Sequence, residues 1–261
     1  MMENMKDIFF LRFNLQRSCA SFGENQFDTK EILSMSDEQI SGFLKKCEEE
    51  QFEVAMELKA EFNETLSVLY GKKILFIGDS ITQDIRGYRG IITKAAQLEA
   101  ESIAFSGATS TDMLRRAYDG INKSFPDIVS LMIGTNDVYF VDKERKVNLV
   151  SMDEYARNVK SILENASSIG AKLIVGTIPP MDEEKAQQHK SNVTKFNTNS
   201  NIRCYNAVLN DEIKRAGAYC IDTYTSILNT PSYFEPDGVH ISPCGHKLLA
   251  KKWIEAILKV M

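Results

Sequence analysis

From about residue 71 onward, short apolar runs alternate with stretches whose apolar positions keep helical spacing. Short apolar runs between such stretches are typical of buried parallel strands. The predicted strands are 73–77, 102–105, 128–133, 173–177 and 218–221, and the predicted helices are 88–99, 111–118, 152–168 and 202–216. A last helix is expected after Ser242 and Pro243, which suit the N-cap and the first turn. This alternation predicts an α/β fold with a parallel sheet covered on both faces by helices.

Before Gly71 the pattern changes to a charged, Glu-rich segment with helical spacing. Ser36 and Gln39 form a capping-box pattern that begins a helix, as do Ser151 and Glu154 before the 152–168 helix. The spacing indicates one long helix or two shorter ones in an N-terminal helical extension, residues 1–70, ahead of a main domain, residues 71–261. We expect these helices to pack on the main domain. A surface for self-association or for another partner is the alternative, and the sequence does not separate the two.

Length, charge and cysteine content limit the classes of function. A chain of 261 residues fits one α/β domain with an appendage, and a net charge of -5 argues against nucleic acid as a partner. The apolar run that starts at Ile8 is interrupted by Arg12, too early for a signal peptide or a membrane span. The odd number of cysteines, with no CxxC spacing, indicates reduced thiols and a cytoplasmic location. These are Cys19, Cys47, Cys204, Cys220 and Cys244.

Residues that can carry chemistry follow the predicted strands, and ligands of such sheets bind at the carboxyl ends of the strands. The first strand ends in FIGDSITQD, so Ser80 stands at a strand-to-helix turn, where we expect it exposed above the sheet as a nucleophile. Capping of the following helix is the alternative role for such a serine. Thr82 replaces the second glycine of GxSxG, which disfavours an α/β-hydrolase elbow, and nucleotide-binding glycine motifs are absent from this turn.

The next two strands end in SGATS and GTND. Gly107 lies in a tight turn before a helix N-terminus and offers a backbone N–H, whereas Asn136 offers a side-chain amide. Either group could stabilise a developing negative charge. Taken singly, each residue also fits an ordinary turn.

Near the C-terminus, Asp237 stands three residues before His240 in one loop that leads into the last helix. An aspartate so placed can accept the Nδ1–H of the histidine and fix its tautomer. His189 and His246 lie in a polar stretch and inside the last helix, where we expect solvated or packed side chains. His240 is therefore the predicted general base.

Four segments in this order, GDSI, SGATS, GTND and DGVH, resemble the sequence blocks of the SGNH hydrolase superfamily, which includes GDSL lipases and esterases. The resemblance covers roughly residues 72–258 and implies a three-layer α/β/α fold with a five-stranded parallel sheet. It also implies a serine hydrolase without a metal or cofactor. The implied site residues are the triad Ser80, Asp237 and His240, the oxyanion donors Ser80, Gly107 and Asn136, and Asp79 facing the substrate. Asp84 departs from the glycine of many relatives, so the entrance beside Ser80 is expected to differ.

These residues predict attack of Ser80 on an ester carbonyl and an acyl-enzyme that water resolves. Residues 182–201 are polar and are expected to form a long surface loop that borders the site or is a variable insertion. Short acyl groups, such as acetyl on a sugar or another small polar alcohol, are the expected substrates, with no membrane involved. Acyl transfer by the same triad, or a non-catalytic binding protein on the same fold, are the alternatives. The oligomeric state stays open.

Overall fold

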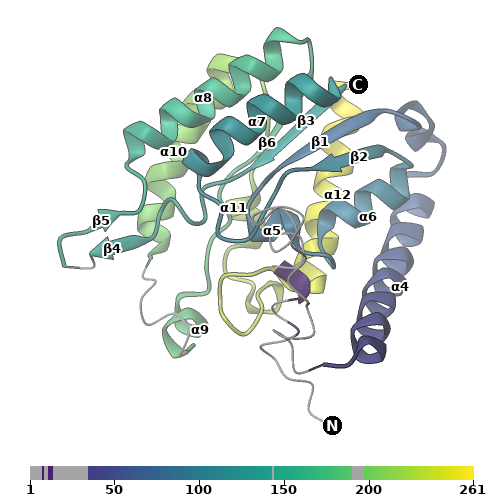
Figure 1. The fold of residues 1–261 in the computed structure, drawn as a ribbon, viewed down its shortest axis with the longest axis horizontal. Helices are drawn as coiled ribbons and strands as arrows, with labels where there is room; N and C mark the ends of the chain where they lie inside the picture. Colours follow the sequence, from purple (N-terminus) through teal and green to yellow (C-terminus); the bar gives the residue numbers. More distant parts are fainter. Residues whose placement is uncertain (1–7, 9–10, 14–34, 143, 190–196) are drawn as a thin grey trace.

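The computed structural model describes residues 8, 11–13, 35–142, 144–189 and 197–261. Its main sheet has five parallel strands in the order β2-β1-β3-β6-β7 (Figure 1). The strands are β1 (Lys73–Gly78), β2 (Glu99–Ser102), β3 (Ile128–Met132), β6 (Lys172–Gly176) and β7 (Tyr219–Ile221). The predicted five-stranded parallel sheet is confirmed.

Helices cover both faces of this sheet, as expected for a three-layer fold (Figure 1). On one face lie α7 (Ser110–Ser124), α8 (Met152–Ser168) and α10 (Asn199–Ala216), and on the other lie α4 (Asp37–Phe62), α6 (Tyr88–Ala96) and α12 (Pro243–Val260). Shorter elements are η1 (Asn63–Leu69), α5 (Ser80–Gln83), α9 (Glu183–Gln188), α11 (Thr223–Ile227), η3 (Pro231–Tyr233) and the hairpin of β4 (Phe140–Asp142) and β5 (Val147–Asn148).

Each face of the sheet has its own hydrophobic core. Along β1, Leu75 and Ile77 pack under α7 and α8, whereas Ile74 and Phe76 pack under α6 and α12. Successive side chains of a strand point to opposite faces, so a strand between two helical layers is mostly apolar on both faces. The central strands therefore read as apolar runs, and the buried Ser130 of β3 is an exception whose hydroxyl accepts the indole N–H of Trp253.

The edge strand lies earlier in the sequence than predicted. We expected it at 102–105, but β2 is Glu99–Ser102, and it is only partly buried. Because an edge strand pairs on one side only, its residues need not be continuously apolar. The apolar Ile103 and Phe105 belong instead to the connection to α7, where they pack against the core.

The two predicted capping boxes have different outcomes. The box of Ser36 and Gln39 is formed at the start of α4. At α8, Ser151 accepts the Glu154 N–H, but the Glu154 side chain pairs with Arg157 rather than with the Ser151 N–H. The second box is therefore only half formed.

The described helices of the N-terminal extension, α4 and η1, pack on the main domain, the arrangement expected above. Ala55 and Leu58 of α4, with Leu66 and Leu69 of η1, are buried in the same core as α6 and α12. No helix in the described parts of the chain is long and apolar enough to cross a bilayer. The described cysteines carry free thiols, and Cys19 lies outside the described residues.

The contact between β6 and α12 gives a test of the fold. A Cβ added at Gly176 would lie 2.6 Å from Cη2 of the buried Trp253. We expect Gly176→Ala to lower the free energy of unfolding by about 1–3 kcal/mol through overpacking. Gly42 in α4 has no atom within 4 Å of its added Cβ, so Gly42→Ala is the control. It should raise the stability by about 0.5–1 kcal/mol. Urea unfolding measures both, and equal effects would contradict the packing described.

Candidate active site

Ser80 and His240, far apart in the sequence, meet at the carboxyl end of β1. The Oγ of Ser80 lies 2.8 Å from Nε2 of His240, and Nδ1 of His240 lies 2.5 Å from Oδ2 of Asp237. Ser80 is the first residue of α5, which begins directly after the strand. A Cβ at Gly78 would collide with Thr82 and with the Met132 carbonyl, so only glycine permits this tight passage from strand to helix. The structure thus brings the three predicted triad residues together.

The loop before α12 holds the histidine in place. Oδ1 of Asp237 accepts the backbone N–H groups of Val239 and His240, both at 2.9 Å, which leaves Oδ2 for the imidazole. Burial would raise the pKa of Asp237, but the hydrogen bond and charge of His240 hold it well below its usual range. Asp237 is therefore ionised at neutral pH. Ionised, it can orient the ring and stabilise an imidazolium.

The strand order places the two predicted oxyanion donors on either side of Ser80. Strand β1 lies between β2 and β3, so the loops with Gly107 and Asn136 flank the serine. Nδ2 of Asn136 donates to the Ala108 carbonyl at 2.9 Å, which ties the two loops together. Because a primary amide carries two hydrogens, a second one is left for a ligand. Gly107 has φ +76° and is exposed at the surface.

A buried carboxylate braces these loops. Asp137, next to Asn136, accepts the backbone N–H of Ser110 at 3.0 Å and its hydroxyl at 2.5 Å. Asn158 of α8 donates to the same hydroxyl. Burial raises the pKa of Asp137 to about 6, and the hydrogen bonds from Ser110 only partly offset this. The start of α7 is thereby fixed beside the Gly107 and Asn136 loops.

The prediction that Ser80 is exposed above the sheet is wrong. Only 5% of Ser80 is accessible, and Phe13, which is fully buried, packs on His240 with the ring centroids 4.2 Å apart. The sequence pattern does not predict this contact. Its signals were Arg12 inside an apolar run and Asp84 in place of the usual glycine. Neither indicated that the two side chains meet.

Arg12 anchors this segment. Its Nη2 and Nε bind the two carboxylate oxygens of Asp84 at 2.5 and 3.2 Å, and its Nη1 binds Glu235 at 2.7 Å. His246 of α12 also contacts Asp84, with Nε2 3.2 Å from Oδ2. Burial would raise the pKa of Asp84, but the His246 hydrogen bond and the Arg12 charge hold it well below its usual range.

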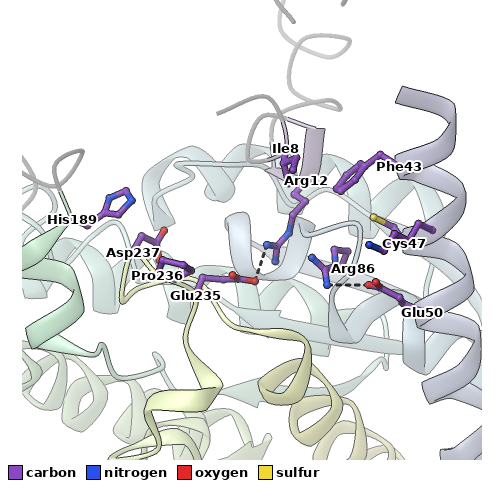
Figure 2. A pocket seen from close by; sticks show the side chains of 11 residues that line it. Ile8, Arg12, Phe43, Cys47, Glu50, Arg86, His189, Glu235, Pro236 and Asp237 are labelled. Atoms are coloured by element: carbon purple, nitrogen blue, oxygen red, sulfur yellow. Dashed lines mark hydrogen bonds and ion pairs between the residues drawn. The ribbon is translucent and has the colours of Figure 1, made fainter. Parts of the chain in front are cut away.

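A cavity of about 260 Å³ opens above this anchor, between α4 and the loop that carries Glu235, Pro236 and Asp237. Figure 2 shows Arg12 between Glu235 and Arg86, with Arg86 paired to Glu50 of α4. Asp237 and His189 also line the cavity.

The remaining predicted residues have varied placements. Asp79 is buried, and its Oδ1 accepts the Ile81 N–H as the N-cap of α5, so contact with substrate stays a prediction. His246 is buried and packed, as expected.

The described part of 182–201 is not simply a loop, because it contains α9 and the start of α10. It borders the site, since the Asp182 N–H donates to the Gly238 carbonyl at 2.8 Å. Among the described residues, no cluster of three or more His, Cys, Asp or Glu is arranged to hold a metal.

The Asp84 pair gives a test of stability. The pKa of Asp84 is lower in the folded protein than in the unfolded chain, where it is about 3.9. Its ionisation therefore stabilises the folded state above this pH, and the stabilisation is lost as the pH falls towards the folded-state pKa. We expect Asp84→Asn to lower the free energy of unfolding at pH 7 by about 3–5 kcal/mol, because it leaves Arg12 buried without its main counter-charge. The difference from wild type should narrow below about pH 4. Asp119→Asn, at an exposed ion pair, is the control and should change little at any pH. A constant difference across pH would contradict the ionised state of Asp84.

Comparison with known proteins shows which family shares this sequence and fold. The GDSL-like lipase/acylhydrolase family matches residues 76–248. An acetylxylan esterase from Geobacillus stearothermophilus is 26% identical over 215 residues, which cover 72% of this chain and 94% of the relative. The crystal structure of an acetylxylan esterase from the same organism has a TM-score of 0.58 at 24% identity, covering 72% of this chain and 94% of that one.

A lipase/acylhydrolase from Enterococcus faecalis has the same fold, with a TM-score of 0.60 at 20% identity over 72% of this chain and 96% of its own. The family match spans well over half of the sequence and begins within β1, so it leaves out the N-terminal extension. The resemblance seen in the four sequence blocks is confirmed. The chain belongs to the GDSL-like lipase/acylhydrolase family of the SGNH hydrolase superfamily, and it is a carboxylic ester hydrolase.

Proposed function

We propose that this esterase removes short acyl groups, acetyl first among them, from a carbohydrate or another small polar alcohol through an acyl-enzyme on Ser80. The observation that carries the proposal is the continuous hydrogen-bonded chain from Ser80 Oγ through His240 to Asp237. Two observations favour a small acyl group. The nucleophile is almost fully enclosed, and two relatives that are matched over 94% of their own length are acetylxylan esterases.

In the proposed reaction, Nε2 of His240 takes the Ser80 proton as Oγ attacks the ester carbonyl. The tetrahedral intermediate collapses when the resulting imidazolium gives this proton to the departing alcohol oxygen. Water then attacks the acyl-enzyme, again with His240 as base, and releases the free acid. Asp237 keeps its charge throughout and stabilises the imidazolium.

The negative charge of the intermediate needs preorganised donors. The N–H of Ser80 is available because the first N–H groups of a helix have no partner inside it. We assign the other two donors to the Gly107 N–H and to the second amide hydrogen of Asn136. All three come from the ends of adjacent strands, so they are fixed before the substrate binds.

Removal of the Asn136 amide tests the oxyanion assignment. We expect Asn136→Ala to lower kcat by about 10²–10³-fold, or about 3–4 kcal/mol, because this donor acts mainly in the transition state. Steady-state kinetics on p-nitrophenyl acetate measure the effect. The control is Asn122→Ala at an exposed position of α7, which should leave kcat unchanged. Full turnover in Asn136→Ala would remove this residue from the mechanism.

Acyl-chain preference tests the substrate assignment. We expect p-nitrophenol release to be fastest from the acetate ester, slower from the butyrate and slowest from the octanoate, and to vanish in Ser80→Ala. With acetylated xylo-oligosaccharide, free acetate should be the product even when an acceptor sugar is present. Preference for octanoate would contradict the small acyl site. Acetate found on the acceptor would identify an acyltransferase instead.

A further inference from the structure

The imidazole of His240 is held on three sides. Its two ring nitrogens bind Ser80 and Asp237, and Phe13 covers one face with an interplanar angle of 34°. Two hydrogen bonds in the ring plane limit in-plane movement but resist tilting only weakly. A buried aromatic ring on the face opposes tilting and keeps water from that face. Phe13 is 0% exposed, so its own ring is closed off from solvent.

Arg12 connects the two segments that carry the reacting residues. Its partner Asp84 ends α5, and the Asp84 N–H donates to the Ser80 carbonyl at 2.9 Å. Its partner Glu235 begins the loop that carries Asp237 and His240, and the Glu235 N–H donates to the His240 carbonyl at 2.8 Å. One guanidinium therefore ties the backbone of the nucleophile to the backbone of the base.

The backbone of the segment is joined to the same place. The Arg12 carbonyl accepts the Ile85 N–H at 3.3 Å, and the Arg12 guanidinium lies 4.8 Å from the Phe13 ring centroid. Figure 1 shows this short purple fragment beside α5. Fixing Arg12 thus also fixes where Phe13 meets the imidazole.

Stability alone is a weak reason for such an arrangement. A buried ion pair is often replaceable by apolar side chains at little cost, since desolvation offsets most of its Coulomb energy. The planar guanidinium of Arg12, which binds two carboxylates, does fix the positions of these carboxylates relative to each other. This geometry acts where a small displacement matters most, because an error of about 1 Å in the reacting atoms can lower a rate about 10²-fold.

We propose that Arg12 and Phe13, which lie outside the region matched by the family, are positioning residues. They hold Ser80 and His240 at the separation and orientation that the reaction needs. The inference rests on the proposed function of this pair. Arg12 sets the separation of the two catalytic segments, and Phe13 sets the plane of the imidazole. The N-terminal extension is thereby part of the active site.

The first test removes the ring. Phe13→Ala should lower kcat on p-nitrophenyl acetate by about 10–100-fold with KM changed less than about threefold, since a positioning residue acts on the chemical step. Phe13→Leu, which keeps most of the apolar volume, should recover most of the loss. The matched control is Phe43→Ala, another phenylalanine of the extension, which lines the nearby cavity. It should leave kcat unchanged. All rates are expressed per active site, counted by stoichiometric labelling with a fluorophosphonate.

The second test keeps the positive charge at position 12 but replaces the guanidinium with an amine. It can be made even if Phe13→Ala does not fold. Arg12→Lys cannot bind both oxygens of Asp84 while reaching Glu235, so kcat should fall by about 3–10-fold at constant KM. Arg86→Lys makes the same change at the neighbouring pair with Glu50 and should have no effect.

The outcomes separate the two proposals. Wild-type kcat per labelled site in Phe13→Ala or in Arg12→Lys would overturn the positioning role of that residue while leaving Ser80 as the nucleophile. A loss that appears only as a raised KM would also overturn it, because it would make the residue a substrate contact. If wild-type enzyme is not labelled at Ser80, the proposed function itself fails.

Discussion

The hydrogen bond between Ser80 and His240 joins two parts of the chain that are 160 residues apart, and the rest of the structure serves to make this contact. Parallel strands contribute because they bring every carboxyl end to one edge of the sheet. Ser80, Gly107 and Asn136 thus follow three adjacent strands. His240 follows no strand. It lies on the loop before α12, where its N–H donates to the Asp237 side chain and its carbonyl accepts the Glu235 N–H.

This edge of the sheet contains several charges removed from water, which is costly unless each is paired. Asp237 is paired with His240, and Asp84 is paired with Arg12 and His246. In both carboxylates the pKa stays below its usual range because a partner outweighs burial. The two pairs have different consequences. In the proposed mechanism the first pair prepares His240 for proton transfer, whereas the second attaches residues 11–13 beside α5, where Ser80 lies.

Much of the site could be predicted from sequence because its signals are local. Asp237 and His240 are three residues apart, and Ser80, Gly107 and Asn136 each follow a strand closely. The exposure of Ser80 was predicted wrongly for the opposite reason. The residues around it are distant in the sequence: His240 contacts it from 160 positions away, and Phe13 packs on His240.

Long-range pairing limits such predictions generally. Asp84 and Arg12 are 72 residues apart. An arginine is expected to be exposed unless the carboxylates that pair with it are known, so the sequence alone does not predict that Arg12 is buried. The edge strand was misplaced because pairing on one side allows polar residues that hydrophobic pattern alone assigns to a loop. The central strands, which lie under helices on both faces, were predicted closely.

The most direct test of the account is to trap the acyl-enzyme. The enzyme would be mixed with p-nitrophenyl acetate, quenched in acid before the intermediate decays, and analysed by peptide mass spectrometry. The account predicts one added acetyl group on the peptide that contains Ser80, and none in Ser80→Ala. Hydrolysis without a covalent intermediate, or an acetyl group that accumulates on another residue at the rate of turnover, would contradict it.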